Sequence, residues 1–142
     1  MRASTKAIGR IGVSVGVGLV LGLAMFGMFG TPTTTPPASA ILTRRTTDFC
    51  TPGWSAAHRH VLPAVRRAVL LRDHAPTPFP HGAEVDHRVS LELGGSNDIS
   101  NLRYQAPGLS ALKDREENRL HRAVCTGKLS VDAAQQQLWA WR

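Results

Sequence analysis

The sequence contains only two cysteines, no visible internal repeat and, over residues 1–40, no acidic residue. Two cysteines allow one disulfide at most, so a dense disulfide framework is excluded. The lack of repeats argues against solenoids and propellers. The lack of acid leaves residues 1–40 basic, with Arg2, Lys6 and Arg10 as their only charged residues. The 142 residues of the chain are enough for one small domain.

The formal net charge of +7 is unevenly distributed along the chain. Beyond residue 40 there are 14 basic and 10 acidic residues, which leaves a net charge of +4. All six histidines also lie beyond residue 40. This moderate basic bias is compatible with a nucleic-acid partner, although small basic domains also use such charge for solubility.

Residues 1–40 have the pattern of a signal peptide. Their basic residues precede an uncharged, mostly apolar run over residues 11–30, and a Pro/Thr-rich stretch ends in Ala38–Ala40 (Ala-Ser-Ala). This small-residue tripeptide predicts signal-peptidase cleavage before Ile41. The apolar run also has about the 20 residues that a membrane helix needs, so an uncleaved membrane anchor is the alternative. Both interpretations predict an exported domain, whether secreted, periplasmic or held at the cell envelope.

Cys50 and Cys125 both lie in the part of the chain that is expected to be exported. An even number of cysteines in an oxidising compartment predicts one disulfide. The bond would connect the start of the domain to the end of a late helix. It would close a long loop, where a crosslink can stabilise by roughly a few kcal/mol in the chain-entropy model. Two free, buried thiols are the alternative.

The pattern beyond residue 40 predicts a linker over residues 41–48 and a mixed α and β domain over residues 49–142. Apolar residues at helical spacing and Pro63 in a first turn predict a short amphipathic helix. Ser130 is a good N-cap for a final helix. The predicted elements are a helix over 63–72, strands over 84–89 and 101–104, and helices over 109–125 and from 130 onward.

The residues best suited to chemistry lie between residues 84 and 102. Asp86 and His87 are adjacent, so on an extended strand their side chains point to opposite faces. A Gly-Gly turn then folds the chain back, and Asn101 can return to the neighbourhood of His87. Phosphodiester hydrolysis needs a base to deprotonate water, and a histidine with a pKa of about 6.5 suits this role. A carboxylate suits Mg²⁺ or Mn²⁺, which would stabilise the developing charge.

This stretch resembles the core of the HNH endonucleases, which is a ββα-metal (His-Me finger) site. In that family the Asp binds a metal ion, the His is the general base and an Asn orients the His. The resemblance implies that Asp86 is a metal ligand and His87 the base. It implies that Asn101, or its backbone, holds the loop and orients His87, with Asn97 as the second choice for that role.

The resemblance extends over residues 48–142, to an exported branch of HNH-like proteins. Its motifs are Cys50-Thr-Pro-Gly, Glu-Val-Asp-His with Leu-Glu-Leu-Gly-Gly, Lys113-Asp114, Glu117, Leu120-His121, Val124-Cys125, Gly127-Lys128-Leu129 and Ala134-Gln135. It implies an α+β fold, with a small ββα-metal core, an added N-terminal helix, C-terminal helices and one disulfide.

The sequence departs from the HNH pattern at the second metal ligand. The family places a His or Asn in the first turn of the helix after Asn-Leu, but here that position is Ala111, which cannot bind a metal ion. Asp114 lies one turn further on the same side and is the predicted substitute. The alternatives are Glu117, His121 and Glu116. His121 is better explained as a packed or capping residue, and the chain lacks the Cys-x-x-Cys pair that brings a structural zinc to some HNH domains.

These observations predict an exported, metal-dependent endonuclease that hydrolyses phosphodiester bonds of DNA, with RNA as the less favoured substrate. A second hypothesis is a non-catalytic module of the same fold that binds nucleic acid or a cell-envelope partner, and Ala111 favours it. A third is a membrane-tethered structural protein in which the motif is coincidental. The membrane would be contacted only through residues 11–30, and only if these are not cleaved.

Overall fold

The computed structural model describes residues 35–141, which belong to a compact unit over residues 31–142. The predicted signal peptide or anchor therefore lies outside the described residues, apart from residues 35–40. Within residues 35–141, none of the helices is both long enough and apolar enough to cross a membrane.

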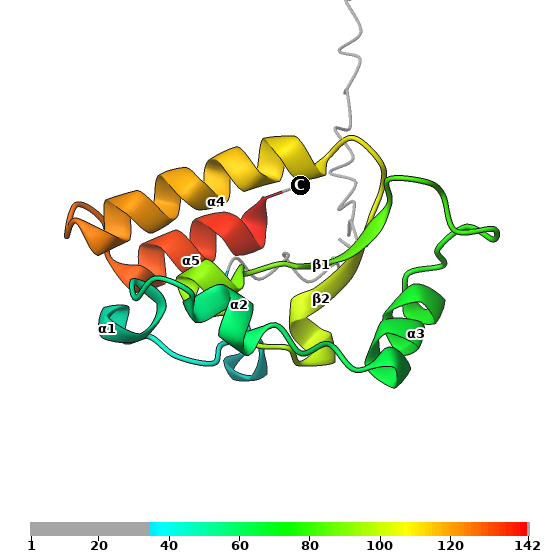
Figure 1. The fold of residues 1–142 in the computed structure, drawn as a ribbon, viewed down its shortest axis with the longest axis horizontal. Coiled ribbons are helices and arrows are strands. Elements are labelled where there is room, and N and C mark those ends of the chain that lie inside the picture. Colours follow the sequence, from blue (N-terminus) through cyan, green and yellow to red (C-terminus); the bar gives the residue numbers. More distant parts are fainter. Residues whose placement is uncertain (1–34, 142) are drawn as a thin grey trace, which may run out of the picture. The chain divides into compact units, whose positions relative to one another are not determined.

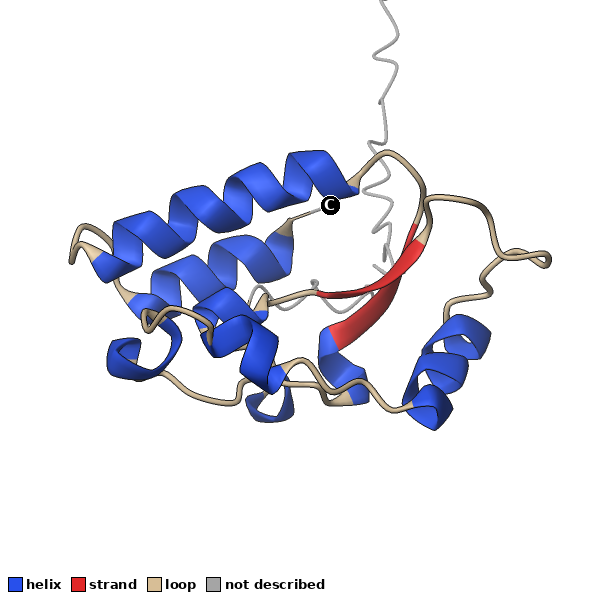
Figure 2. Cartoon of the chain, viewed as in Figure 1, coloured by secondary structure: helices blue, strands red, loops and turns tan. Residues whose placement is uncertain are grey.

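The described residues form a small α+β domain, which confirms the α+β part of the predicted fold (Figure 2). Two antiparallel strands, β1 (Glu84–His87) and β2 (Leu102–Gln105), make its sheet. Its α-helices are α1 (Thr46–Phe49), α2 (Trp54–His58), α3 (Pro63–Arg72), α4 (Ser110–Cys125) and α5 (Val131–Ala140). Short 3-10 helices are η1 (Ala38–Ala40), η2 (Leu91–Leu93) and η3 (Ile99–Asn101).

The two long helices at the end of the chain, α4 and α5, lie side by side (Figure 1). The helix α5 begins where predicted, because the side chain of Ser130 accepts a hydrogen bond from the backbone of Ala133. Both helices turn apolar residues toward the domain and bury them. The buried apolar cluster contains Ala40, Phe49, Val89, Leu93, Leu120, Val124, Ala134, Leu138 and Trp139.

The strand β1 ends at His87, two residues before the predicted end. The reason lies in Asn101, whose side chain accepts from the amide of Val89 at 2.8 Å and donates to its carbonyl at 2.9 Å. These bonds satisfy the backbone of Val89 where a second strand would otherwise do so. The backbone ladder is therefore replaced by one buried side chain.

The disulfide between Cys50 and Cys125 is confirmed. Cys50 is the residue after α1, and Cys125 is the last residue of α4. The bond joins the start of the domain to the end of a late helix, as the sequence predicted.

The start of the described chain differs from the prediction of a linker over residues 41–48. Ile41 forms a β-bridge with Gly95, and α1 occupies the end of the predicted linker. Ala40, the last residue of the predicted cleavage tripeptide, is fully buried in the apolar cluster. These residues have backbone and packing partners in the domain, which sequence periodicity does not reveal.

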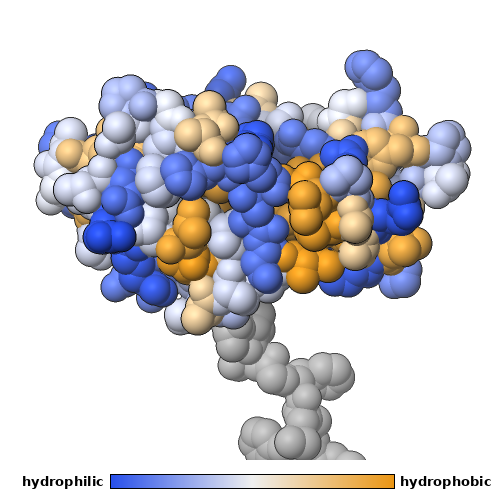
Figure 3. All heavy atoms as spheres, turned by 60° about the horizontal axis from the view of Figure 1, so that its bottom comes forward, coloured by the Kyte–Doolittle hydropathy of each residue, from blue (hydrophilic) through white to orange (hydrophobic). Residues whose placement is uncertain are grey.

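Large apolar side chains also lie at the surface of the described residues. Leu71 is 72% exposed and Leu62 is 64% exposed. Figure 3 shows apolar areas on one face that are separated by hydrophilic side chains. The surface on this side is therefore mixed in character.

Candidate functional site

The strand β1 places Asp86 and His87 on opposite faces of the sheet, because neighbouring side chains of a strand alternate. In the antiparallel register, Asp86 lies opposite Arg103 and His87 lies opposite Leu102. The imidazole of His87 is buried, and the Asp86 side chain retains 17% exposure. The two predicted site residues thus have separate surroundings.

The imidazole of His87 contacts the side chain of Asn97, with 3.0 Å between Nε2 and Oδ1. Asn97 donates from Nδ2 to the backbone carbonyl of His58 at 2.7 Å, which fixes the orientation of the Asn97 amide. Its Oδ1 is therefore the acceptor toward His87, and Nε2 of His87 carries the hydrogen. In the neutral imidazole this assignment leaves the lone pair on Nδ1.

Asn101 has a different place in the site. Its side chain is fully buried and makes the two bonds to Val89 described above, with a further bond from Nδ2 to the carbonyl of Ser96 at 2.8 Å. It thus holds the loop between β1 and β2, which is one part of the role predicted for it. The contact with His87 is made by Asn97, the second choice.

Burial lowers the pKa of His87, because the charged imidazolium is costly to desolvate. The hydrogen bond with Asn97 opposes this shift, and nearby Arg59 and Lys113 reinforce it, while Asp86 acts in the other direction. The net effect holds His87 as a neutral imidazole near neutral pH. A neutral imidazole is the form that can accept a proton.

The carboxylate of Asp86 lies among cations. The ammonium of Lys113 is 2.9 Å from Oδ2 of Asp86, and Nε of Arg103 is 3.8 Å from the same oxygen. The contact with Lys113 is an ion pair without the alignment of a hydrogen bond. Oδ2 is thus already paired, which leaves Oδ1 as the oxygen open to a further ligand.

Lys113 is the residue of α4 that contacts both Asp86 and the backbone of β1. Its side chain is only 1% exposed, and its ammonium also donates to the backbone carbonyl of His87 at 2.7 Å and to the carboxylate of Glu117. Burial raises the pKa of Glu117, and the charge of Lys113 works against this rise. One buried cation therefore joins both acids to the strand that carries His87.

The other predicted metal ligands on α4 are spread along the helix. Asp114 is exposed and follows Lys113 in the sequence, while Glu116 pairs with Arg119 at 2.6 Å. His121 lies near the far end of the helix, where its Nε2 contacts the carbonyl of Phe49 at 3.2 Å. Of the alternatives to Asp114, Glu117 shares a partner with Asp86.

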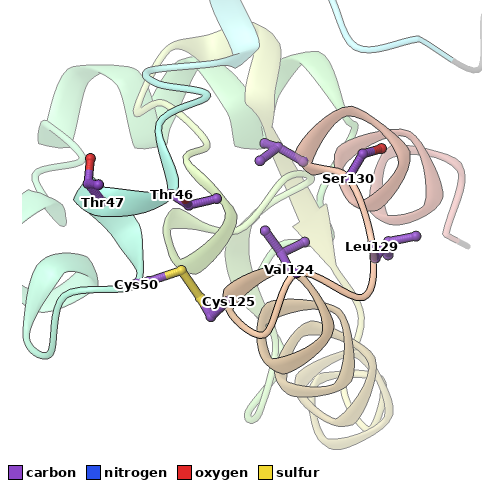
Figure 4. A pocket seen from close by; sticks show the side chains of 9 residues that line it. Thr46, Thr47, Cys50, Val124, Cys125, Leu129 and Ser130 are labelled. Carbon is purple, nitrogen blue, oxygen red and sulfur yellow. A yellow bond between two sulfur atoms is a disulfide. The ribbon is translucent and has the colours of Figure 1, made fainter.

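Within residues 35–141, the one group of three His, Cys, Asp or Glu side chains at metal-binding spacing is Cys50, His121 and Cys125. Their ligand atoms lie within 4.8 Å of one another, so the group could hold a metal ion. The two sulfurs are, however, bonded to each other, and it is the thiolate that ligates metals. Figure 4 shows this disulfide at the wall of a pocket of about 490 Å³ that Thr46, Val124 and Leu129 also line.

Sequence reasoning missed two cations of the site, Lys113 and Arg103, which both lie against Asp86, and it also missed the place of Arg88. Arg88 stacks over Trp139 with its guanidinium carbon 3.4 Å from the ring centroid. Burial lowers the pKa of Arg103, whose Nη1 donates to the carbonyl of Trp141 at 3.1 Å. The position of Arg103 could have been found by pairing the two predicted strands, because the antiparallel register places Arg103 opposite Asp86.

Comparisons of the chain with protein-family models, with curated proteins and with solved structures gave no match in any of the three. The function is therefore argued from the geometry of the site.

Proposed function

We propose that the protein is an exported, metal-dependent endonuclease that hydrolyses phosphodiester bonds, with DNA preferred over RNA. The observation that carries the proposal is the pairing of His87 with Asn97 in a buried position. It gives an imidazole that is oriented, neutral and one residue from a carboxylate. In this proposal β1, β2 and α4 form the ββα-metal unit of the HNH type.

The chemistry assigned to His87 follows from its tautomer. Because Nε2 donates to Asn97, Nδ1 is the atom that would accept a proton from the attacking water. The hydrogen bond to Asn97 then stabilises the imidazolium that forms. Arg103 and Lys113 supply positive charge on the side of β1 that carries Asp86, which favours an approaching phosphate.

Asp86 and Asp114 are the residues that would hold Mg²⁺ or Mn²⁺. Oxygen donors suit both ions, and Mg²⁺ is commonly held by one or two carboxylates while it retains several waters. Asp86 fits through Oδ1, and Asp114 offers an exposed carboxylate on the neighbouring helix. When bound, the ion would stabilise the negative charge that develops on the phosphate.

A second candidate is a non-catalytic module of the same fold that binds nucleic acid or a cell-envelope partner. The ion pair between Lys113 and Asp86 favours it, because an ammonium at 2.9 Å competes with a metal ion for the carboxylate. A domain without a metal ion would retain its basic residues for binding and would lack cleavage.

The two candidates separate in a plasmid-nicking experiment. Residues 31–142, with the disulfide formed, are incubated with supercoiled DNA and Mg²⁺ or Mn²⁺, beside an EDTA control. The endonuclease predicts nicking that EDTA abolishes and that His87→Ala reduces by about 100-fold or more. His81→Ala is the matched control, because His81 is an exposed loop residue. A folded domain that binds DNA and leaves it intact would establish the module.

A further inference from the structure

The stretch from Ala38 to Thr43, which we call the strap, lies against the loop between the two strands. In chain order it includes η1, which lies beside η3 (Figure 1). The strap contains the predicted cleavage tripeptide, and the loop carries Asn97 and Asn101. The contact therefore links a processing signal to the candidate site.

Backbone bonds join the strap to the loop at several points. The amide of Ser96 donates to the carbonyl of Ala40 at 3.0 Å, and its hydroxyl donates to the carbonyl of Ser39 at 2.5 Å. On the other side, the amides of Leu42 and Thr43 both donate to the carbonyl of Gly94, at 2.8 and 3.1 Å. Ser96 immediately precedes Asn97, so these bonds fix the base of the residue that reaches His87.

The strap lies so close to Gly94, the first glycine of the loop, that it leaves no room for a side chain there. Gly94 has a φ of +76°, and a Cβ at this position would lie 2.1 Å from the carbonyl oxygen of Thr43. A side chain is thus excluded both by the backbone conformation and by the strap. The Gly-Gly motif of the sequence serves the close approach of these two segments as well as the turn.

Buried residues of the core also hold the strap against the loop. Ala40 is fully buried in the apolar cluster, and Gln135 of α5 donates to the carbonyls of both Thr43 and Leu93. The strap and the residue before the glycine turn therefore share one buried amide. Removal of the strap would expose this part of the core and leave backbone groups of the loop without partners.

We propose that the strap is a positioning element for the loop that carries Asn97 and Asn101, so that a peptidase cut before Ile41 loosens the contact of Asn97 with His87. A cut there removes Ser39 and Ala40, whose carbonyls accept the hydrogen bonds of the Ser96 hydroxyl and amide. Cleaved and uncleaved forms of the protein then differ at the site. The inference relies on the proposed function only for the choice of His87 as the group that is positioned.

The test compares three chains: the full chain, residues 31–142, which keep the strap, and residues 41–142, which lack its first half. Amide hydrogen exchange is measured at Ser96, with Leu138 of α5 as the internal reference. The expected result is a loss of protection at Ser96 of at least about tenfold in residues 41–142, with much less change at Leu138. Equal protection of Ser96 in all three chains would overturn the proposal.

A second readout follows His87 itself through the chemical shifts of its ring nitrogens at a fixed alkaline pH, which report which nitrogen carries the hydrogen. Nε2 carries it in the structure because Nε2 donates to Asn97, so loosening of that contact is expected to give a mixture of the two neutral tautomers. An unchanged tautomer of His87 in residues 41–142 would contradict the proposal even if that chain were less stable. This readout needs no cleavage activity, so failure of the endonuclease proposal leaves it intact.

If residues 41–142 do not fold, the substitution Ser96→Ala in the full chain carries the test. It removes the hydroxyl bond to Ser39, together with the bond that the hydroxyl accepts from the amide of Asp98, and it leaves the chain uncut. The expected effect is a smaller change of the His87 tautomer in the same direction. Ser55→Ala, on α2, is the control, and an equal effect of both substitutions would contradict the inference.

Discussion

At the scale of single residues, the structure divides between two asparagines the roles that the sequence-based prediction gave to Asn101 alone. Asn97 reaches the imidazole of His87, whereas Asn101 satisfies the backbone around Val89 and Ser96. One orients a side chain, and the other holds a loop. Their substitutions should therefore have different consequences.

Asn97→Ala should lower the pKa of His87 further, because the hydrogen bond that His87 donates to Asn97 is the main contact that raises it. The free energy of unfolding should fall by about 1–3 kcal/mol, because Asn97 makes two hydrogen bonds, one with His87 and one to the carbonyl of His58. Asn101→Ala should cost roughly 3 kcal/mol or more, since it leaves several buried backbone groups unpaired. Urea denaturation and NMR titration of His87 measure both effects.

Asn118→Ala is the matched control for both, because Asn118 is exposed and bonds only to the backbone of its own helix. Equal destabilisation by the substitutions of Asn97 and Asn101 would contradict the division of roles. A rise in the pKa of His87 in Asn97→Ala would contradict the assigned direction of the hydrogen bond.

The buried imidazole also makes stability depend on pH. The pKa of His87 is lower in the folded protein than its ordinary value of about 6.5, so the unfolded chain binds a proton first as the pH falls. The stabilisation from His87 is complete above that ordinary value and is lost as the pH falls through the lowered one. The free energy of unfolding should therefore drop more steeply between about pH 7.5 and pH 5 in the parent protein than in His87→Gln.

Two acids, Glu117 and Asp73, also make the free energy of unfolding depend on pH. The pKa of Glu117 is raised by burial, so its contribution is present at low pH and is lost as the pH rises above about 4.5, with a sign opposite to that of His87. The hydrogen bond with Arg72 lowers the pKa of Asp73, whose contribution is lost only below about pH 4. The difference between the parent and His87→Gln removes both. Parallel curves for these two proteins would show that His87 titrates normally.

At the scale of elements, helical and strand periodicity predicted most of what the structure contains. The helices α3, α4 and α5 lie where Pro63, the apolar spacing and the cap at Ser130 place them. The end of β1 was not predictable, because it depends on a side chain that lies twelve or more residues further on and returns through a loop. The same holds for the strap, whose Pro/Thr-rich neighbourhood has no periodicity to signal burial.

The helix α4 shows a second limit of periodicity. A lysine on an amphipathic helix is expected to be exposed, yet Lys113 is buried between Asp86 and Glu117. Its role arises only when the helix is packed on β1. The sequence-based ligand assignments on α4 were made without this cation, and they stay predictions.

The cluster around Lys113 predicts a gain of metal binding when the lysine is replaced. Lys113→Met leaves Asp86 and Glu117 without their shared cation, which should lower the free energy of unfolding by roughly 3–5 kcal/mol. The freed carboxylates should then bind Mn²⁺, so Mn²⁺ should raise the melting temperature of Lys113→Met more than that of the parent. Differential scanning fluorimetry with and without EDTA measures this difference.

Lys128→Met is the control, because Lys128 lies exposed in the turn after α4. A second substitution, Asp86→Asn in the Lys113→Met background, should abolish the response to Mn²⁺. An equal Mn²⁺ response in the parent and in Lys113→Met would show that the ammonium does not compete with a metal ion for Asp86.

At the scale of the whole described domain, the disulfide between Cys50 and Cys125 stabilises a small apolar core. The apolar cluster draws on residues from Ala40 to Trp139, and the disulfide lies between partners 75 positions apart in the sequence. Its existence and pairing were predictable, because two cysteines allow a single intramolecular bond. Its neighbour His121 was not, since only the fold brings that side chain beside the sulfurs.

The length of the loop closed by this bond sets the size of its effect. In the chain-entropy model, a loop of this length gives a stabilisation of about 4 kcal/mol, chiefly by restricting the unfolded chain. Cys50→Ala combined with Cys125→Ala should lower the free energy of unfolding of residues 31–142 by that amount. Reduction of the parent by dithiothreitol should have nearly the same effect, provided that EDTA prevents the freed thiolates and His121 from binding a metal ion. Equal urea midpoints for the oxidised parent and the double variant would instead show that noncovalent packing alone holds the ends of α1 and α4 together. A higher urea midpoint for the reduced parent with Zn²⁺ than with EDTA would show that Cys50, Cys125 and His121 hold a metal ion once the disulfide is broken.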